Sequence, residues 1–275
     1  MNLYLLNNNP SKWQPITDSA TRHTGLNIRS ITSTENIFPT DFVMPTHSQV
    51  VPKCQLIGNR IYNRLQRMRL MENLGLRLIN WSSLDNFPEI FKTWNTNVVV
   101  YKSDYSAVGR YVDLIYKDHT LPNYADANKD IMMEFIPDHP QVLKVYFCHD
   151  TIVTSYMWNL PSLNHPYFKQ IIHNAAQKCD LATLVEILPT DVEQATQIVM
   201  RFLKDKYMGF CSIDFMIWQG SWSISELNIS GVGSNIISRI NKNWSAYFSK
   251  GLASLAIDLH TNKPSLDFIG QAFAN

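Results

Sequence analysis

The sequence lacks the features that mark several large classes of protein. Its 24 Lys and Arg residues nearly balance its 23 Asp and Glu residues, and the formal charge of +1 argues against a general nucleic-acid-binding protein, whose surface is usually basic. No apolar run approaches the roughly 18 residues that cross a bilayer. The first ten residues, MNLYLLNNNP, have neither the basic start nor the apolar length of a signal peptide. We therefore expect a cytoplasmic protein that binds neither nucleic acid nor membrane.

The cysteines are too few and too scattered to form a familiar motif. Cys54, Cys148, Cys179 and Cys211 include no CxxC pair and no Cys/His spacing typical of a metal site. We expect them to be buried free thiols, which is consistent with a reducing compartment.

What the sequence does contain predicts a globular α+β protein. The chain has 275 residues, 45% of them hydrophobic, so it can build a substantial core. Residues 1–57 are polar, carry five prolines and show no helical period, so we expect short strands and loops there. Amphipathic helices are predicted at 59–75, 190–209 and 243–259, the second with a capping box formed by Thr190 and Glu193 and an end at Gly209, and a short helix is predicted near 84–94. Strands are predicted at 77–81, 97–102, 110–116, 131–136, 142–149, 151–158 and 181–188.

The most informative segment is SIDFMIWQGSWSISELNIS, residues 212–230, which predicts a β-hairpin around Gln219–Gly220–Ser221. Glu226 and Asn228 are two positions apart on the second strand and so share a face, and the hairpin would bring Asp214 beside them. Two carboxylates and an amide oxygen suit Mg²⁺. Acidic residues on a hairpin can equally be the solvated face of a strand.

Several basic residues could meet a nucleotide phosphate if that hairpin binds Mg²⁺. Lys102 ends a buried-type strand and precedes a loop of small residues, 103–109, that has only one glycine. Lys144 lies within an alternating strand, and Arg64 lies on the first predicted helix. Each also has an ordinary interpretation, as a solvated strand end, an outward strand face or a surface charge.

The segment MMEFIPDH, residues 132–139, has two interpretations. A strand that leaves its sheet offers backbone groups to adenine, with Glu134 placed to meet the exocyclic amine and Asp138 to meet the ribose. The alternative is an ordinary strand-to-turn junction at Pro137.

The order and spacing of these segments resemble the ATP-grasp family, in particular the ribosomal-protein glutamate ligase and related peptide-modifying carboxylate–amine ligases. The resemblance runs from about Asn59 to about Ile240. The D-x₁₁-E-x-N pattern of metal ligands is kept in full at Asp214, Glu226 and Asn228. The positions that match nucleotide-binding residues of the family are Arg64, Lys102, Glu134, Phe135, Ile136 and Asp138.

Two further segments match catalytic arginines of the family with lysines. VLKVYFCHD puts Lys144 at one of them, and the segment at 168–173 puts Lys169 at the other. Arg64 in turn stands where the family has lysine, so charge is kept while the geometry of the donors changes. Other departures are Ile171 in place of asparagine, the thin glycine-rich loop, and an N-terminal region that looks shorter than usual.

The resemblance implies an ATP-grasp fold, in which two α/β subdomains clasp ATP, with a reduced N-terminal region. The implied boundaries are 1–58 for that region, 59–140 for a lid subdomain and 141–275 for the catalytic subdomain. The implied activity is ADP-forming ligation of a carboxylate and an amine through an acyl phosphate, with ATP and Mg²⁺, or Mn²⁺ in its place.

The resemblance also implies roles for the matched residues. Asp214, Glu226 and Asn228 would hold the metal, and Arg64 and Lys102 would bind the α- and β-phosphates. Lys144 and Lys169 would stabilise the transferring phosphoryl group and the tetrahedral intermediate.

Two other functions remain open at this point. A degenerate ATP-grasp module would bind nucleotide or a partner without turnover, and an ATP-grasp kinase would stop after phosphoryl transfer. The acceptor is open between a small molecule, a peptide and a protein. The final helix could form a dimer face in a homo-oligomer, although packing on the core is the simpler expectation.

Overall fold

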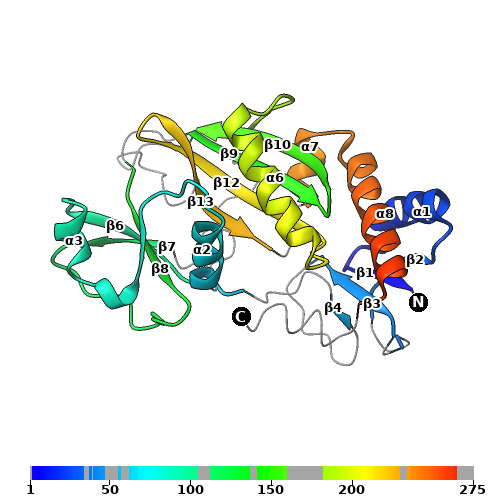
Figure 1. The fold of residues 1–275 in the computed structure, drawn as a ribbon, viewed down its shortest axis with the longest axis horizontal. Helices are drawn as coiled ribbons and strands as arrows, with labels where there is room; N and C mark the ends of the chain where they lie inside the picture. Colours follow the sequence, from blue (N-terminus) through cyan, green and yellow to red (C-terminus); the bar gives the residue numbers. More distant parts are fainter. Residues whose placement is uncertain are drawn as a thin grey trace.

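The computed structural model describes residues 2–33, 37–38, 40–46, 55–56, 62–104, 112–136, 141–159, 182–229 and 234–264. These residues form three β-sheets that follow one another along the molecule, with helices packed between and against them (Figure 1). The α+β class predicted from the sequence is confirmed.

The first sheet is parallel and belongs to the N-terminal region. It has the order β2-β1-β3-β4, with strands β1 (Leu3–Leu6), β2 (Ile28–Ile31), β3 (Phe42–Pro45) and β4 (Gln55–Leu56). Helix α1 (Pro10–Thr24) connects β1 to β2. The expectation of strands and loops alone was therefore wrong here.

The two prolines of helix α1, Pro10 and Pro15, do not break it. Pro10 is the first helical residue, where no N–H is required, and the Asn9 side chain accepts a hydrogen bond from Lys12 N to cap the helix. Trp13, Ile16 and Ala20 do follow a helical period on the buried face.

The second sheet is built from β5 (Trp81–Ser83), β6 (Val98–Lys102), β7 (Val112–Tyr116) and β8 (Ile131–Glu134) in the order β5-β8-β6-β7. The connection from β5 to β6 contains η1 (Leu84–Asn86) and α3 (Ile90–Thr93). Helix α2 (Arg64–Asn73) precedes this sheet and is capped by Asn63 and Gln66 in a capping box. Gly75 follows with a left-handed φ of 69°, as predicted for the residue that ends the helix.

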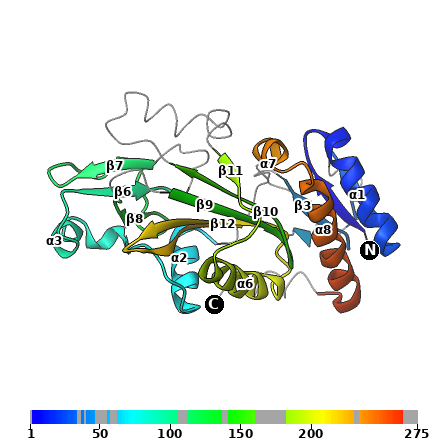
Figure 2. The same cartoon turned by 90° about the horizontal axis from the view of Figure 1, so that it is seen from above.

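The third sheet is antiparallel and has the order β11-β10-β9-β12-β13. Its strands are β9 (Gln141–Cys148), β10 (Thr151–Asn159), β11 (Ala182–Leu184), β12 (Phe210–Trp218) and β13 (Ser221–Asn228). In the chain, α6 (Thr190–Lys204) lies between β11 and β12, and α7 (Ser234–Ile240) and α8 (Trp244–Asn262) follow β13. Figure 2 shows α6 lying against the sheet.

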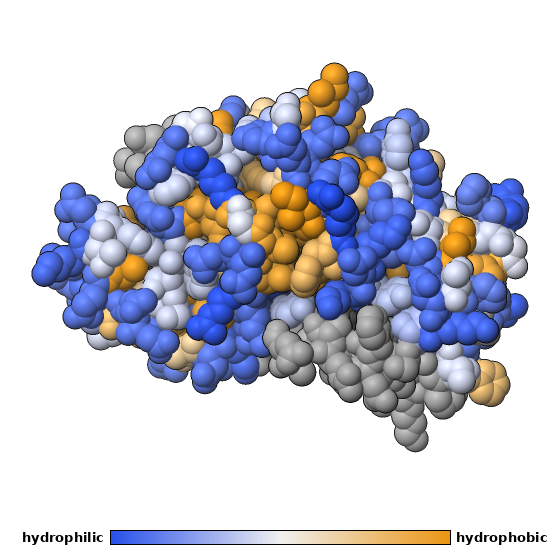
Figure 3. Space-filling model, viewed as in Figure 1, coloured by the Kyte–Doolittle hydropathy of each residue, from blue (hydrophilic) through white to orange (hydrophobic). Residues whose placement is uncertain are grey.

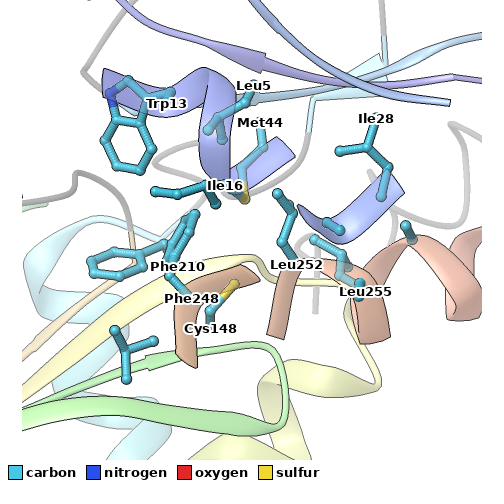
Figure 4. Close-up of a cluster of buried hydrophobic side chains, with 14 of the residues drawn as sticks. Leu5, Trp13, Ile16, Ile28, Met44, Cys148, Phe210, Phe248, Leu252 and Leu255 are labelled. Atoms are coloured by element: carbon cyan, nitrogen blue, oxygen red, sulfur yellow. The ribbon is translucent and has the colours of Figure 1, made fainter. Parts of the chain in front are cut away.

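The third sheet separates two hydrophobic cores. Alternate residues of β9 enter different cores, with Val145 and Phe147 packing with α6 and Tyr146 and Cys148 packing with α8. The core under α8 also includes Trp13 of α1, so α8 joins the third sheet to the N-terminal region (Figure 4). The final helix therefore packs on the core, as expected.

The other core reaches the surface in part. Its partly buried members come from α2, from α6 and from the segment that follows α2, among others. In the view of Figure 3, apolar surface lies near the centre of the molecule and is flanked by hydrophilic residues.

The start and end of α6 differ from the prediction. Pro189 occupies the N-cap, Thr190 is the first helical residue, and the described residues include no side-chain hydrogen bond that caps this end. The predicted capping box is therefore wrong, because it placed the helix start one residue too late. The helix ends at Lys204 rather than at Gly209, and Tyr207 takes a left-handed φ of 56° in the turn that follows.

The cysteine prediction is confirmed for two residues. Cys148 and Cys211 are free and buried, and burial raises the pKa of both thiols. Cys54 and Cys179 lie outside the described residues.

Candidate functional site

A row of charged side chains crosses three neighbouring strands of the third sheet. Lys144 on β9 lies opposite Asp214 on β12, and Asp214 lies opposite Glu226 on β13. Lys144 Nζ is 2.5 Å from Asp214 Oδ1, and both side chains are largely buried, at 13% and 14% exposure. The hairpin predicted from the sequence is confirmed, and it places the two carboxylates side by side.

These charged side chains lie on the face of the third sheet against which α8 packs. On β12, Ile213 and Phe215 pack into the core against α6, whereas Phe210 packs under α8. Because strand residues alternate between faces, Asp214 shares the face of Phe210. Along β9 and β12 this face changes from apolar, at Cys148 and Phe210, to charged, at Lys144 and Asp214.

A β-bulge in β13 shapes the site. Asp214 pairs with Glu226, but Phe215 pairs with Ile224, so Ser225 is an extra residue in this strand. The Ser225 hydroxyl donates to the Asp214 carbonyl at 3.1 Å, and the Ser225 carbonyl accepts from Lys102 Nζ at 3.2 Å. The bulge therefore gives Lys102, which comes from the second sheet, an anchor beside the carboxylates.

The apolar positions of β13 reflect this bulge. Ile224 and Leu227 are three positions apart, yet both are buried in the same core. A strict two-residue period cannot place both on one face, so an extra residue between them was required.

Arg64 reaches the second of these carboxylates, Glu226, from α2. Its Nη2 lies 3.2 Å from Glu226 Oε1, and its Nε donates to the Ser103 carbonyl at 3.1 Å. The Arg64 side chain is only 4% exposed. The surface-charge interpretation of Arg64 is therefore wrong, and so is the interpretation of Lys102 as a solvated strand end.

The charges at the site shift one another's pKa values. Burial works to lower the pKa of Lys144, but the Asp214 carboxylate, together with Tyr146 and Glu226, outweighs it and raises that pKa above its usual range. Burial lowers the pKa of Lys102, and the Arg64 guanidinium adds to the effect. Burial would raise the pKa of Glu226, but Arg64 and Lys102 hold it well below its usual range. Lys144 and Glu226 are therefore charged at neutral pH.

The donor set fits a hard divalent cation. Asn228 lies on β13 two residues after Glu226 and is half-buried. Among the described residues, no three His, Cys, Asp or Glu side chains gather in a way that would hold a metal. Mg²⁺ suits such a site because it is commonly bound through one or two carboxylates, with water and phosphate oxygens completing its shell.

The predicted adenine segment lies where β8 ends. The Glu134 carboxylate accepts hydrogen bonds from Asn80 Nδ2 at 2.9 Å and from Trp218 Nε1 at 3.2 Å. Phe135 and Ile136 follow the strand and are half-buried. Trp218 belongs to β12, so the segment adjoins the tip of the same hairpin that carries Asp214.

Three parts of the predicted site lie outside the described residues. They are Lys169, Asp138 and the loop at 105–110 that follows Lys102. The structure therefore brings together Arg64, Lys102, Lys144, Asp214 and Glu226.

Comparison with known proteins identifies the fold. No family model matches this sequence, and a search of curated proteins finds no match. Many solved structures are similar in fold. One is a RiPP-associated ATP-grasp ligase from Chryseobacterium gregarium in complex with ADP and with a leader and core peptide. Its TM-score is 0.64 and its sequence identity 10%, and the match covers 96% of this chain and 98% of that chain.

Two further structures show the same likeness. The ATP-grasp ligase PsnB, complexed with minimal precursor, Mg and ADP, has a TM-score of 0.60 at 12% identity, over 92% of this chain and 96% of that chain. A RimK domain ATP-grasp protein from Sphaerobacter thermophilus has a TM-score of 0.60 at 8% identity, over 93% of this chain and 99% of that chain.

These likenesses show that the chain has the ATP-grasp fold, as the sequence resemblance predicted. They extend over nearly the whole length of this chain and of each neighbour. No helix in the described ranges is long and apolar enough to cross a membrane.

Proposed function

We propose that this protein is an ATP- and Mg²⁺-dependent ligase that joins a carboxylate to an amine, forms ADP and passes through an acyl phosphate. The observation that carries the proposal is the convergence of two adjacent carboxylates, Asp214 and Glu226, with three cations from three different elements. Lys144 and Arg64 pair with the carboxylates, and Lys102 donates to the Ser225 carbonyl beside them. Phosphoryl transfer needs positioning and charge neutralisation more than covalent help from the protein, and this arrangement supplies both.

The described residues divide between the metal and the nucleotide. Asp214, Glu226 and Asn228 would hold Mg²⁺, which neutralises phosphate charge when bound. Arg64 and Lys102 bind the α- and β-phosphates. The adenine lies against residues 134–136, and Asp138 is assigned to the ribose.

The chemical step depends on cations that meet charge as it develops. Lys144 is fixed on the central strand β9 and stays protonated because Asp214 raises its pKa. It stabilises the transferring phosphoryl group and then the oxyanion formed when the amine attacks the acyl phosphate. Lys169 is assigned the same role on the other side of the reacting carboxylate.

We assign a peptide as one of the two substrates. Two of the three neighbours described above are ligases captured with a peptide, a leader and core peptide in one and a minimal precursor in the other. These likenesses support a peptide substrate, with either its carboxylate or its amine taking part in the new amide bond.

The test is to incubate the protein with ATP, Mg²⁺ and candidate peptides, beginning with short peptides encoded beside its gene, with and without added amino acids. ADP release together with a product that has lost one water confirms ligation. A stable phosphorylated product would instead indicate a kinase, and the absence of ADP with every mixture would favour a binding module.

Variants of the two carboxylates connect the activity to this site. We expect Asp214→Asn and Glu226→Gln each to lower the rate of ADP formation by about 100-fold or more, because removing one electrostatic contact to a transition state costs on this order. Glu72→Gln is the matched control, since Glu72 is exposed on α2. Full turnover in either site variant would contradict the metal assignment.

A further inference from the structure

The loop that follows Lys102 is bonded to the start of α2 through one acidic side chain. Asp104 Oδ1 accepts a hydrogen bond from the Arg64 backbone N–H at 2.8 Å and another from Arg67 Nη2 at 3.1 Å. Its side chain is 13% exposed. Asp104 thus holds the first turn of α2, from which the Arg64 side chain extends to Glu226.

Asp104 is itself held by a second, fully buried carboxylate. The Asp104 backbone N–H donates to Asp130 Oδ1 at 2.8 Å. The other oxygen of Asp130 accepts from the Tyr101 hydroxyl at 2.6 Å and from the Asp126 N–H at 2.8 Å. Asp130 is 1% exposed, so the end of β6 is fixed on both sides of Lys102.

The charge of Asp104 is unfavourable for a phosphate site. A carboxylate beside cations that bind an anion weakens anion binding by Coulomb repulsion. Its ion pair with Arg67 offsets part of that cost. The charge of Asp104 therefore does not favour phosphate binding. What its side chain does is connect α2, which carries Arg64, to the end of β6, which carries Lys102.

We propose that Asp104 is a positioning residue that sets the spacing between Arg64 and Lys102, so that both cations can bind the phosphates of one nucleotide. The inference rests on the proposed function in one respect, namely that these two cations bind the phosphates of ATP. Arg64 receives its orientation from the loop as well, because its Nε donates to the Ser103 carbonyl next to Asp104.

The test compares the binding of Mg²⁺·ADP and of adenosine to wild type and to Asp104→Ala by calorimetry. We expect ADP affinity to fall by about tenfold or more, as for a loss of about 1.4 kcal/mol or more, while adenosine affinity stays within about twofold. If Asp104 acted only through its charge, Asp104→Ala would bind ADP more tightly than wild type. A residue that acted only through stability would lower the melting temperature and leave ADP affinity unchanged in the folded protein.

A conservative variant covers the case in which Asp104→Ala does not fold. The amide oxygen of Asp104→Asn can take the place of Oδ1 and accept both hydrogen bonds, but it lacks the charge that pairs with Arg67. The ADP affinity of this variant should therefore lie between those of wild type and Asp104→Ala. Asp118→Ala is the control for net charge, since it removes an exposed carboxylate from the turn after β7.

The outcomes separate the inference from the function on which it rests. Wild-type protein that binds no ADP overturns both. Wild-type protein that binds ADP, with equal or tighter binding in the folded Asp104 variants, overturns the positioning role alone.

Discussion

Lys144 and Asp214 form an ion pair of 2.5 Å across strands β9 and β12. On the next strand Glu226 pairs with Arg64 at 3.2 Å. The carboxylates assigned to the metal are thus paired with cations assigned to the nucleotide and to catalysis. Under the proposed function, Mg²⁺ would compete with these cations for the carboxylates, and phosphate would compete with the carboxylates for the cations.

This competition predicts that Mg²⁺ and nucleotide bind cooperatively. Mg²⁺ that binds Asp214 and Glu226 releases Lys144 and Arg64 to meet phosphate oxygens, so each ligand promotes the other, with a coupling of about fivefold or more. Glu226→Gln removes one carboxylate charge. We expect this variant to bind ADP about fivefold more tightly than wild type when EDTA is present, and to lose the gain that Mg²⁺ gives to wild type.

Calorimetric titration of ADP with and without Mg²⁺ measures this coupling directly and does not depend on turnover. Glu72→Gln again serves as the control and should match wild type under both conditions. Weaker binding of metal-free ADP to Glu226→Gln would show that Glu226 does not compete for Arg64.

The Lys144–Asp214 pair also makes a prediction about stability. The pKa of Lys144 is raised in the folded protein, so protonated Lys144 stabilises the fold below the usual lysine pKa, and this effect is lost as the pH rises through the higher folded pKa. Burial raises the pKa of Asp214, so its ionised carboxylate offsets part of that effect. Breaking a buried pair by removing one partner costs about 3–5 kcal/mol, and the slight exposure of both side chains reduces this to about 2–4 kcal/mol for Lys144→Met at pH 7.

A double-mutant cycle isolates the pair. Lys144→Met with Asp214→Asn leaves no unpaired buried charge, so its loss of unfolding free energy in urea should be smaller than the sum of the two single losses. Additive losses would mean that the two side chains do not interact in solution.

How much of this site can be predicted from sequence depends on how local each feature is. The hairpin of β12 and β13 could be predicted because it pairs residues close in sequence, but strict alternation would pair Asp214 with Ser225, and it is the bulge that places Asp214 opposite Glu226. The partner of Arg64 could not be predicted from pattern, since Glu226 lies 162 positions away on another sheet. Asp104 was missed because a single acidic residue in a loop belongs to no period.

Helix α1 shows a different kind of failure. Its buried positions do repeat with a helical period, but it carries prolines at its first and sixth positions, and proline disfavours a helix when its position in the helix is ignored. Proline at the first position is favourable, since its missing N–H would have had no helical partner.

Lys102 should show a trade-off between stability and binding. Burial lowers its pKa in the folded protein, so its charge destabilises the fold at neutral pH. That cost shrinks as the pH rises through the lowered folded pKa and is gone above the usual lysine pKa. We expect Lys102→Met to melt at the same temperature as wild type or higher at pH 7, with ADP affinity lowered about tenfold or more through loss of a phosphate contact. Thermal unfolding at pH 7 and pH 9.5, with calorimetry for ADP, checks both parts.

The matched control for Lys102 is Lys117→Met, which removes an exposed charge just after β7. It should change neither ADP affinity nor the pH dependence of the melting temperature. A large fall in stability of Lys102→Met would show instead that its hydrogen bond to the Ser225 carbonyl outweighs the cost of burying the charge.

Gly251 should be intolerant of any side chain, because α8 crosses β9 there with no space between them. A Cβ at this position would lie 2.3 Å from the Cys148 carbonyl oxygen and 2.8 Å from the Cys148 Cβ. Both obstacles belong to the central strand of the third sheet, which cannot give way as a flexible side chain would. We expect Gly251→Ala to lower the free energy of unfolding by about 2–3 kcal/mol, the usual cost of overpacking a core, as measured in urea.

Lys250→Ala, one position earlier and exposed, should be close to neutral. Because α8 also contacts Trp13 of α1, pushing α8 away from β9 would loosen the N-terminal region from the sheet that carries the site. Tryptophan fluorescence should therefore report an earlier unfolding step in Gly251→Ala than circular dichroism does. Wild-type stability in Gly251→Ala would mean that α8 does not approach Cys148 this closely.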